Sequence, residues 1–176
     1  GYGAGITITG PTLRAYRRLG LLDEIKQAGA ITTKTRLYRY DGTLMQVLDE
    51  PVIEEGLPAT GGIMRPVLHR IMQTRVKALD IPVRLGVTVT ALESDDQGVD
   101  ATFSDGSTGR YDLVIGADSV FSAVRELAFP HMAPAQPTGQ GCWRISIRKP
   151  PGLSESEFFL GTDTPCGITA CSPDNV

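Results

Sequence analysis

The sequence has few cysteines, no long apolar run and no cluster of one charge, and each lack excludes a class of protein. Its three cysteines, Cys142, Cys166 and Cys171, lack CxxC spacing and are odd in number, which favours reduced thiols in a cytoplasmic protein over a disulfide frame. Neither His69 nor His131 has metal-ligand spacing. No apolar run approaches the roughly 20 residues of a membrane span. The net charge is -3 and the arginines are scattered, so the sequence shows no clustered positive charge of the kind that binds nucleic acid.

One segment, Asp112 to Arg125 with the sequence DLVIGADSVFSAVR, carries the strongest signal for a ligand site. Its apolar run Leu113–Ile115 does not alternate with polar residues, which predicts a parallel strand that is covered on both faces. Asp118 follows at the carboxyl end of this strand, which is the edge where open α/β sheets bind ligands. We expect its carboxylate to accept hydrogen bonds from the hydroxyls of a ribityl or ribose chain.

The residues after Asp118 predict the beginning of a helix. Ser119 or Ser122 is suited to cap it, because a serine oxygen accepts hydrogen bonds from the free backbone N–H groups of a first turn. We expect Arg125, within that helix, to face the same crevice as Asp118. An ordinary strand, turn and helix without a ligand remains an equally open interpretation of this segment alone.

Glycine and proline positions predict the other elements of the first half. A helix begins at Gly10 and ends at Gly20. An Asp-Gly pair predicts the turn of a hairpin near residues 31–50. Pro66 begins a longer amphipathic helix, and Arg65 immediately before it favours an anion or a phosphate-bearing cofactor.

The second half predicts a small sheet and then a new domain. Val87 to Leu92 and Val99 to Phe103 alternate on either side of a polar loop, which indicates an antiparallel meander. Prolines are frequent beyond Leu127 and surround one run typical of a strand, Cys142–Arg148. We therefore expect a second domain to begin near residue 134.

Four segments, in this order along the chain, resemble the FAD-dependent aromatic hydroxylases, the single-component flavoprotein monooxygenases that include salicylate and para-hydroxybenzoate hydroxylases. They are Gly3 to Ile25, Arg65 to Met72, Gly86 to Gly106, and Asp112 to Arg125, the last of which is similar to the family motif DLVIGADG..S.VR. The resemblance implies an α/β fold with a partial Rossmann-like FAD-binding domain, an antiparallel β-meander and the beginning of a β-sheet substrate domain. The FAD-binding part would take residues 1–133, with the hairpin as an excursion, and the incomplete substrate domain residues 134–176.

The same resemblance implies FAD as cofactor, NAD(P)H as electron donor, and O₂ and a small aromatic or heteroaromatic compound as substrates. It assigns the cofactor contacts to nine residues: Gly3, Ala4, Gly5 and Ile6 beside the flavin, Arg65 toward the phosphates, Val89 at the adenine, and Asp118, Ser119 and Arg125 in the acidic motif. In this family one oxygen atom enters the ring and the other leaves as water. The sequence identifies no general acid or base.

Two departures from the family pattern leave other interpretations open. Ser119 stands where the motif has glycine, and the GxGxxG turn and the later GDAAH-type motif are missing from these residues. We therefore expect the chain to be an internal piece of a longer enzyme, either apo or completed by another copy or fragment. The alternatives are a flavin-dependent reductase or desaturase of the same fold, and a truncated, non-catalytic binding module.

Overall fold

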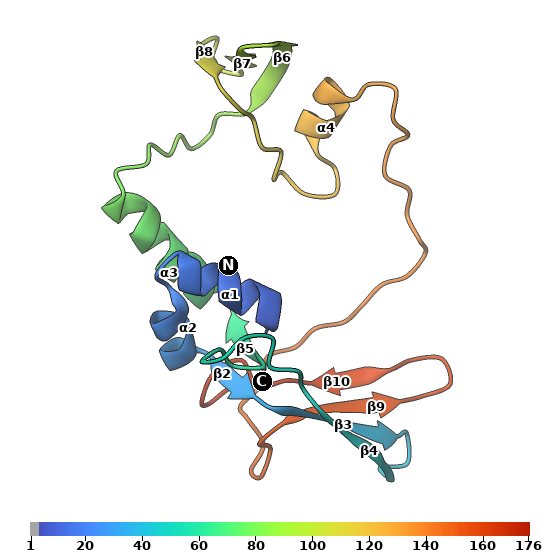
Figure 1. Cartoon of the computed structure of the whole chain (residues 1–176). Coiled ribbons are helices and arrows are strands. Elements are labelled where there is room, and N and C mark those ends of the chain that lie inside the picture. Colours follow the sequence, from blue (N-terminus) through green and yellow to red (C-terminus); the bar gives the residue numbers. More distant parts are fainter. Residues whose placement is uncertain (1–3) are drawn as a thin grey trace. The chain divides into compact units, whose positions relative to one another are not determined.

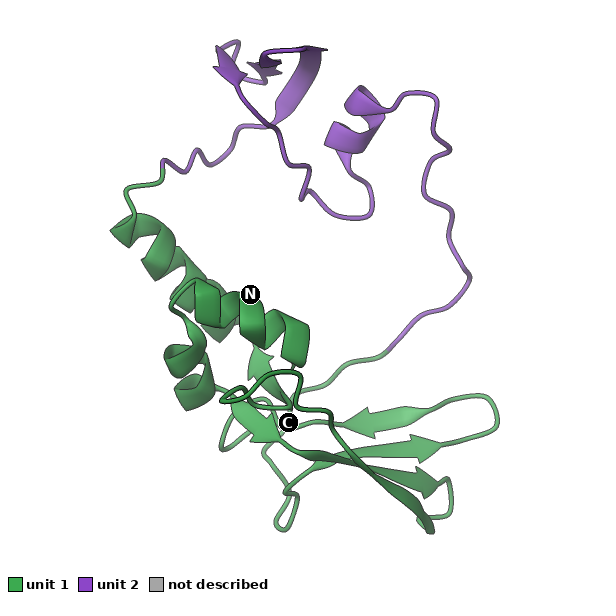
Figure 2. Ribbon diagram, in the orientation of Figure 1, with its two compact units in different colours: residues 1–81, 143–176 green, residues 82–142 purple. Residues whose placement is uncertain are grey.

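The structure is a computed structural model that describes residues 4–176. The chain divides into two compact units, which Figure 2 draws in different colours. Unit 1 comprises Gly1–Ile81 and Trp143–Val176, and unit 2 comprises Pro82–Cys142. Each unit has its own strands and helices (Figure 1).

Unit 1 contains a three-stranded antiparallel sheet, here called sheet A, with the strand order β1-β5-β2. Its strands are β1, Gly5–Thr9, β5, Thr60–Met64, and β2, Ala30–Thr32. Gly5 pairs with Met64. Because successive side chains alternate between the two faces of a strand, Ile8 and Ile63 lie on the face opposite to Gly5 and Gly62. The sheet therefore has an apolar face and a face with two glycines.

Three helices cover the apolar face of sheet A: α1, Gly10–Arg18, α2, Leu22–Ala28, and α3, Arg65–Ala78. Their apolar side chains form one buried core with the sheet, made of Ile8, Leu13, Leu21, Leu22, Ile25, Leu57, Ile63 and Leu68. Gly20, just beyond α1, has a φ of 72°, a left-handed conformation that glycine adopts without strain. Helices α1 and α3 agree with the sequence-based predictions.

The second sheet of unit 1, sheet B, has the order β10-β9-β3-β4. Its strands are β3, Lys34–Arg39, β4, Leu44–Asp49, β9, Ser156–Leu160, and β10, Cys166–Ile168. The turn between β3 and β4 contains Gly42 with a φ of 84°, and the predicted hairpin is confirmed. Strand β9 pairs with β3 in parallel, so the hairpin shares a sheet with the last part of the chain.

Unit 2 contains the predicted meander, with the order β6-β7-β8, and a short helix that packs against β6. The elements are β6, Val89–Asp95, β7, Gly98–Phe103, β8, Thr108–Tyr111, and α4, Ala123–Ala128. The guanidinium of Arg110 in β8 pairs with Asp95 and Asp100, each at 2.6 Å. These pairs join all three strands of the meander.

Two predicted strands are wrong. Leu113–Ile115 forms no strand, and Leu113 and Ile115 are 72% and 78% exposed. Cys142–Arg148 forms only one isolated bridge, between Arg148 and Asn175, and Trp143 is fully exposed. An apolar run becomes a strand only when a neighbouring strand satisfies its backbone groups. Among residues 4–176, no strand pairs with either run.

The α/β fold class with an antiparallel meander agrees with the prediction. The domain boundary near residue 134 stays a prediction, since the compact units divide the chain at other positions. In the part of the chain that the structure describes, no helix combines the length and apolar character required to cross a membrane.

Candidate functional site

Asp118 lies in the loop before α4, and its carboxylate faces the beginning of that helix. Its Oδ1 accepts a hydrogen bond from the Ser122 hydroxyl, and its Oδ2 accepts one from the Val124 backbone N–H at 3.1 Å. The bond from Ser122, followed by that from Val124, holds the pKa of Asp118 below its usual value. A carboxylate has about four acceptor positions, so this exposed, ionised group retains capacity for a ligand.

Ser119 has a φ of 83° at the position where the related motif has glycine. This left-handed conformation is uncommon for residues other than glycine, so the serine keeps the turn at the cost of backbone strain. Gly116, shortly before it, allows close packing, because a Cβ at this position would lie 2.9 Å from Cγ1 of Val124. Ser119 therefore adopts a backbone conformation that glycine would adopt without strain.

Ser122, rather than Ser119, caps helix α4. Its Oγ accepts a hydrogen bond from the backbone N–H of Arg125 at 3.0 Å. The guanidinium of Arg125 donates to the carbonyl of Val120 at 3.3 Å, so this side chain folds back on its own loop. Asp118 thus lies in the loop before α4 and Arg125 within α4, with the guanidinium engaged by the loop, and the shared crevice stays a prediction.

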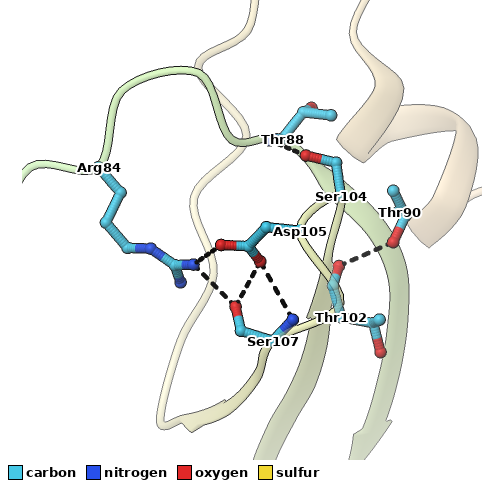
Figure 3. Close-up of polar contacts among 7 residues, drawn as sticks. All are labelled: Arg84, Thr88, Thr90, Thr102, Ser104, Asp105 and Ser107. Carbon is cyan, nitrogen blue, oxygen red and sulfur yellow. Dashed lines mark hydrogen bonds and ion pairs between the residues drawn. The ribbon is translucent and has the colours of Figure 1, made fainter.

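Val89 begins β6 at a bulge. Val89 pairs with Phe103 and Ala91 with Thr102, so Thr90 is the extra residue. Its hydroxyl donates to the carbonyl of Thr102 at 3.2 Å (Figure 3). A bulge disrupts the hydrogen-bond ladder locally, and such a site suits the backbone contact that was predicted at Val89.

A polar cluster holds the turn between β7 and β8 (Figure 3). Arg84 donates to Asp105 Oδ2 at 2.5 Å and to Ser107 Oγ at 2.7 Å, and its guanidinium lies 4.7 Å from the centre of the Phe103 ring. Hydrogen bonds from Ser107, and then the charge and hydrogen bond of Arg84, lower the pKa of Asp105 to about 2. Sequence analysis did not identify this cluster, because only the Asp-Gly turn was visible there.

In unit 1, the predicted residues meet where β1 begins next to α3. The backbone N–H of Arg65 donates to the carbonyl of Ala4 at 3.2 Å, and Gly5 pairs with Met64. Arg65 is the first residue of α3 and its side chain is exposed. Ile6 follows in β1, while Gly3 lies outside the described residues. The helix start, the cation and the glycine strand are thus neighbours, while their predicted contacts with a cofactor stay predictions.

The glycine face of sheet A is covered by the last segment of the chain. A Cβ at Gly5 would collide with the Sγ of Cys171, and a Cβ at Gly62 would collide with the carbonyl oxygen of Ala170. Cys171 is buried, and burial raises the pKa of its thiol. Sequence analysis missed this contact, for which the adjacent glycines in the TGGIM strand were the single available signal.

The predicted cofactor residues fall into two groups. Those in unit 1 are Ala4, Gly5, Ile6 and Arg65, and those in unit 2 are Val89, Asp118, Ser119 and Arg125. The unit 1 group contains one charged side chain, that of Arg65, which suits a phosphate. The unit 2 group contains two, Asp118 and Arg125, and the carboxylate suits hydroxyl groups.

Comparison with known proteins gives a consistent result. Residues 2–172 match the family described as FAD binding domain. The FAD-dependent monooxygenase OpS4 of Beauveria bassiana is 33% identical over 155 residues, which cover 83% of this chain and 35% of that protein. The 2-heptyl-3-hydroxy-4(1H)-quinolone synthase of Pseudomonas aeruginosa is 27% identical over 157 residues, which cover 89% of this chain and 39% of that protein. The chain spans less than half the length of the curated relatives it matches.

Solved structures show the same fold. HpxO of Klebsiella pneumoniae, complexed with FAD and uric acid, matches with a TM-score of 0.73 and 22% identity over 98% of this chain and 45% of that one. PqsL of Pseudomonas aeruginosa, in complex with 2-aminobenzoylacetate, matches with a TM-score of 0.78 and 17% identity over 98% of this chain and 48% of that one. The match therefore extends over both units of the chain.

Proposed function

Because the chain belongs to the FAD-binding domain family, we propose that the whole protein is an FAD-dependent monooxygenase that hydroxylates a small aromatic or heteroaromatic compound with NAD(P)H and O₂. The observation that carries this proposal is the left-handed backbone of Ser119 beside Asp118. Strained backbone gathers at functional sites and persists where the surrounding structure imposes it. The turn keeps a left-handed conformation at Ser119 although the glycine of the motif is absent. This retention favours a functional cofactor site.

The residues of unit 2 fit one part of the cofactor. Asp118 would accept hydrogen bonds from cofactor hydroxyls with the acceptor positions that Ser122 and Val124 leave free. The bulge at Val89 would meet the adenine through its backbone, and Ser119 would allow close approach through its turn. Arg125 would act by holding the loop, because its guanidinium donates to Val120.

The residues of unit 1 fit another part. Arg65 would face the phosphates, since its charge stands at the first turn of α3, where free N–H groups also favour anions. Ala4, Gly5 and Ile6 would border the flavin. Because Cys171 takes the space beside Gly5, a ring beside this strand would meet the thiol as well as the glycine.

When bound, FAD would supply the redox chemistry, and the protein would supply binding, orientation and exclusion of water. The balanced reaction consumes NAD(P)H, a proton, O₂ and the aromatic compound, and it yields NAD(P)⁺, the hydroxylated compound and water. We assign no general acid or base. Asp118 and Arg65 have the task of holding the cofactor in place.

The names of two relatives support an aromatic substrate. One is the quinolone synthase described above, and another is the 3-amino-4-hydroxybenzoate 2-monooxygenase PtmB3 of Streptomyces platensis, 32% identical over 127 residues. In sheet B, the rings of Tyr38 and Phe159 stack at 5.0 Å. We propose that this sheet belongs to a substrate domain that includes residues 134–176 and the hairpin.

The test is to purify the full protein, record its visible spectrum and flavin content, and follow NAD(P)H and O₂ consumption with salicylate, 4-hydroxybenzoate and anthranilate. We expect bound FAD and, with at least one of these compounds, a product that carries one atom from ¹⁸O₂. Flavin reduction without any labelled product would identify a reductase instead. A protein that binds no flavin would contradict the proposal altogether.

Location and assembly are part of the same proposal. The three cysteines are free in the structure, and reduced thiols are typical of the cytoplasm. We propose a cytoplasmic enzyme, with association between copies as a further possibility for the exposed run Leu113–Ile115. Cell fractionation and light scattering of the purified protein test these two points.

A further inference from the structure

Thr33 marks the point where the chain passes from one sheet of unit 1 to the other. It is the single residue between β2, which belongs to sheet A, and β3, which belongs to sheet B. The backbone at this residue therefore sets the direction in which sheet B leaves sheet A. Figure 1 shows β2 leading directly into β3.

Glu155 holds this crossing from a segment more than a hundred residues away. Its Oε2 accepts hydrogen bonds from the backbone N–H groups of Thr33 and Lys34, each at 3.0 Å, and its Oε1 accepts one from the Thr33 hydroxyl at 3.3 Å. One carboxylate thus satisfies three donors. The residue immediately precedes β9, whose Ser156 pairs with Thr35.

The opposite side of the crossing is held by the end of β4. The backbone N–H of Glu50 donates to the carbonyl of Thr33 at 2.8 Å, and the Glu50 carboxylate accepts a hydrogen bond from the Thr35 hydroxyl at 2.5 Å. Both backbone groups of Thr33 are therefore engaged, one by each strand that flanks β3. The crossing is fixed by five hydrogen bonds rather than by turn geometry alone.

We propose that Glu155 is a positioning residue that fixes sheet B relative to sheet A and thereby couples oxygen use to hydroxylation. This inference rests on the proposed function, in which β1 of sheet A borders the flavin and sheet B belongs to the substrate domain. In the coupled reaction, NAD(P)H, a proton, O₂ and the substrate give NAD(P)⁺, hydroxylated product and water. When the substrate is misplaced, NAD(P)H, a proton and O₂ give NAD(P)⁺ and H₂O₂.

A small displacement suffices for this effect. A misplacement of about 1 Å caused by a change far from the chemistry can lower a rate roughly 100-fold. Glutamine at position 155 would keep the length of the side chain but replace one acceptor oxygen by an amide NH₂, which cannot accept from an N–H or O–H donor. The Thr33 hydroxyl would then have to accept from the amide instead of donating. The backbone N–H groups of Thr33 and Lys34 would share a neutral oxygen in place of a charged one, and the crossing would loosen because such hydrogen bonds are weaker.

The test compares Glu155→Gln and Glu155→Asp with the control Glu157→Gln in the full FAD-loaded protein. Glu157 lies within β9, the strand that Glu155 precedes, and accepts one long hydrogen bond, from the Tyr38 hydroxyl at 3.4 Å, away from the crossing. The substrate probe is whichever of salicylate, 4-hydroxybenzoate and anthranilate gives the most labelled product. The measurements are the share of O₂ released as H₂O₂, and amide hydrogen exchange over residues 30–36.

We expect both Glu155 variants to exchange the amides of Thr33 and Lys34 faster and to release a severalfold larger share of H₂O₂, with the control unchanged in both. Faster exchange with unchanged coupling would overturn the proposal and leave Glu155 a purely structural role. Unchanged exchange would overturn the hydrogen-bonding role itself. Failure of the proposed function is recognised separately, because the wild-type protein would then form no labelled product, and the coupling role would fall with it.

Discussion

The thiol of Cys171 lies so close to Gly5 that residue 5 has no room for a side chain. Alanine at position 5 would force β1 and the segment around Cys171 apart, and overpacking of this kind typically costs about 1–3 kcal/mol. We therefore expect Gly5→Ala to lower the free energy of unfolding by that amount in urea titrations. Gly141→Ala is the control, since a Cβ there meets nothing within 4 Å.

A double variant tests whether Cys171 is the cause. In Gly5→Ala with Cys171→Ala, the sulfur is absent and the nearest remaining contact of the new Cβ is the Cβ of residue 171 at 3.2 Å. Most of the lost stability should return. If the double variant loses as much free energy of unfolding as the two single variants lose together, the collision is not what excludes alanine from position 5.

The strain at Ser119 predicts that glycine is the more stable residue there. A left-handed conformation costs a residue with a Cβ about 1–2 kcal/mol, while glycine loses about 0.5–1 kcal/mol more backbone entropy on folding. Ser119→Gly should therefore raise the free energy of unfolding slightly, by roughly 0.5–1 kcal/mol. Ser119→Ala keeps the strain and serves as the control. A loss of stability in the glycine variant would show that the hydroxyl itself stabilises the turn.

The lowered pKa of Asp105 predicts that the turn between β7 and β8 in unit 2 is sensitive to acid. Its pKa is lowered to about 2 by Ser107 and Arg84, below the ordinary value of 3.8 that applies in the unfolded chain. The ionised group therefore stabilises the folded state at every pH above 3.8, and this contribution is lost as the pH falls from 3.8 through 2. The protection of the Ser107 amide, taken as its exchange rate relative to that of an unstructured peptide at the same pH, should fall over this window in the wild type. In Asp105→Asn this protection should be low already at neutral pH, and an equal, pH-independent protection in both proteins would contradict the assignment.

Local signals predicted most of the fold, and distant partners account for what was missed. The helix that ends at Gly20 and the hairpin turn at Gly42 depend on residues close in sequence, and both form as expected. The run Leu113–Ile115 has the composition of a buried strand but no neighbouring strand among residues 4–176, and it stays exposed. Glu155 was not identified, because its hydrogen bonds to Thr33 join residues that no periodicity connects.

The same distinction applies to the candidate site. The sequence predicted a helix start after Asp118 with Ser119 or Ser122 as its cap, and the structure selects Ser122. The contact between Cys171 and Gly5 depends on how the chain returns to β1, and the adjacent glycines of the TGGIM strand do not identify the partner. The ligand contacts of Arg65 and Val89 stay predictions that binding experiments decide.

Asp118 should affect cofactor retention more than folding. Asparagine at this position keeps one oxygen for the backbone N–H of Val124 but lacks the charge that strengthens hydrogen bonds from cofactor hydroxyls. In the full protein, Asp118→Asn should release FAD faster on dialysis and slow flavin reduction by NAD(P)H, while the thermal unfolding midpoint shifts little. Asp112→Asn, in the preceding exposed stretch, is the matched control. Unchanged flavin content and reduction rate in Asp118→Asn would remove this residue from the cofactor site.

The chain of 176 residues, purified by itself, should hold FAD only weakly. A dinucleotide is bound tightly when a glycine-rich turn and a helix start neutralise its pyrophosphate, and these residues contain no GxGxxG turn. Arg65 and Asp118 would contact only part of such a cofactor. The exposed run Leu113–Ile115 would pair with a strand supplied by an added segment that carries this turn. We therefore expect little yellow colour after dialysis of the 176-residue chain, and recovery of flavin binding when a βαβ segment with GxGxxG from a relative is fused before it. Stoichiometric FAD that survives dialysis of the chain alone would show that its own residues suffice.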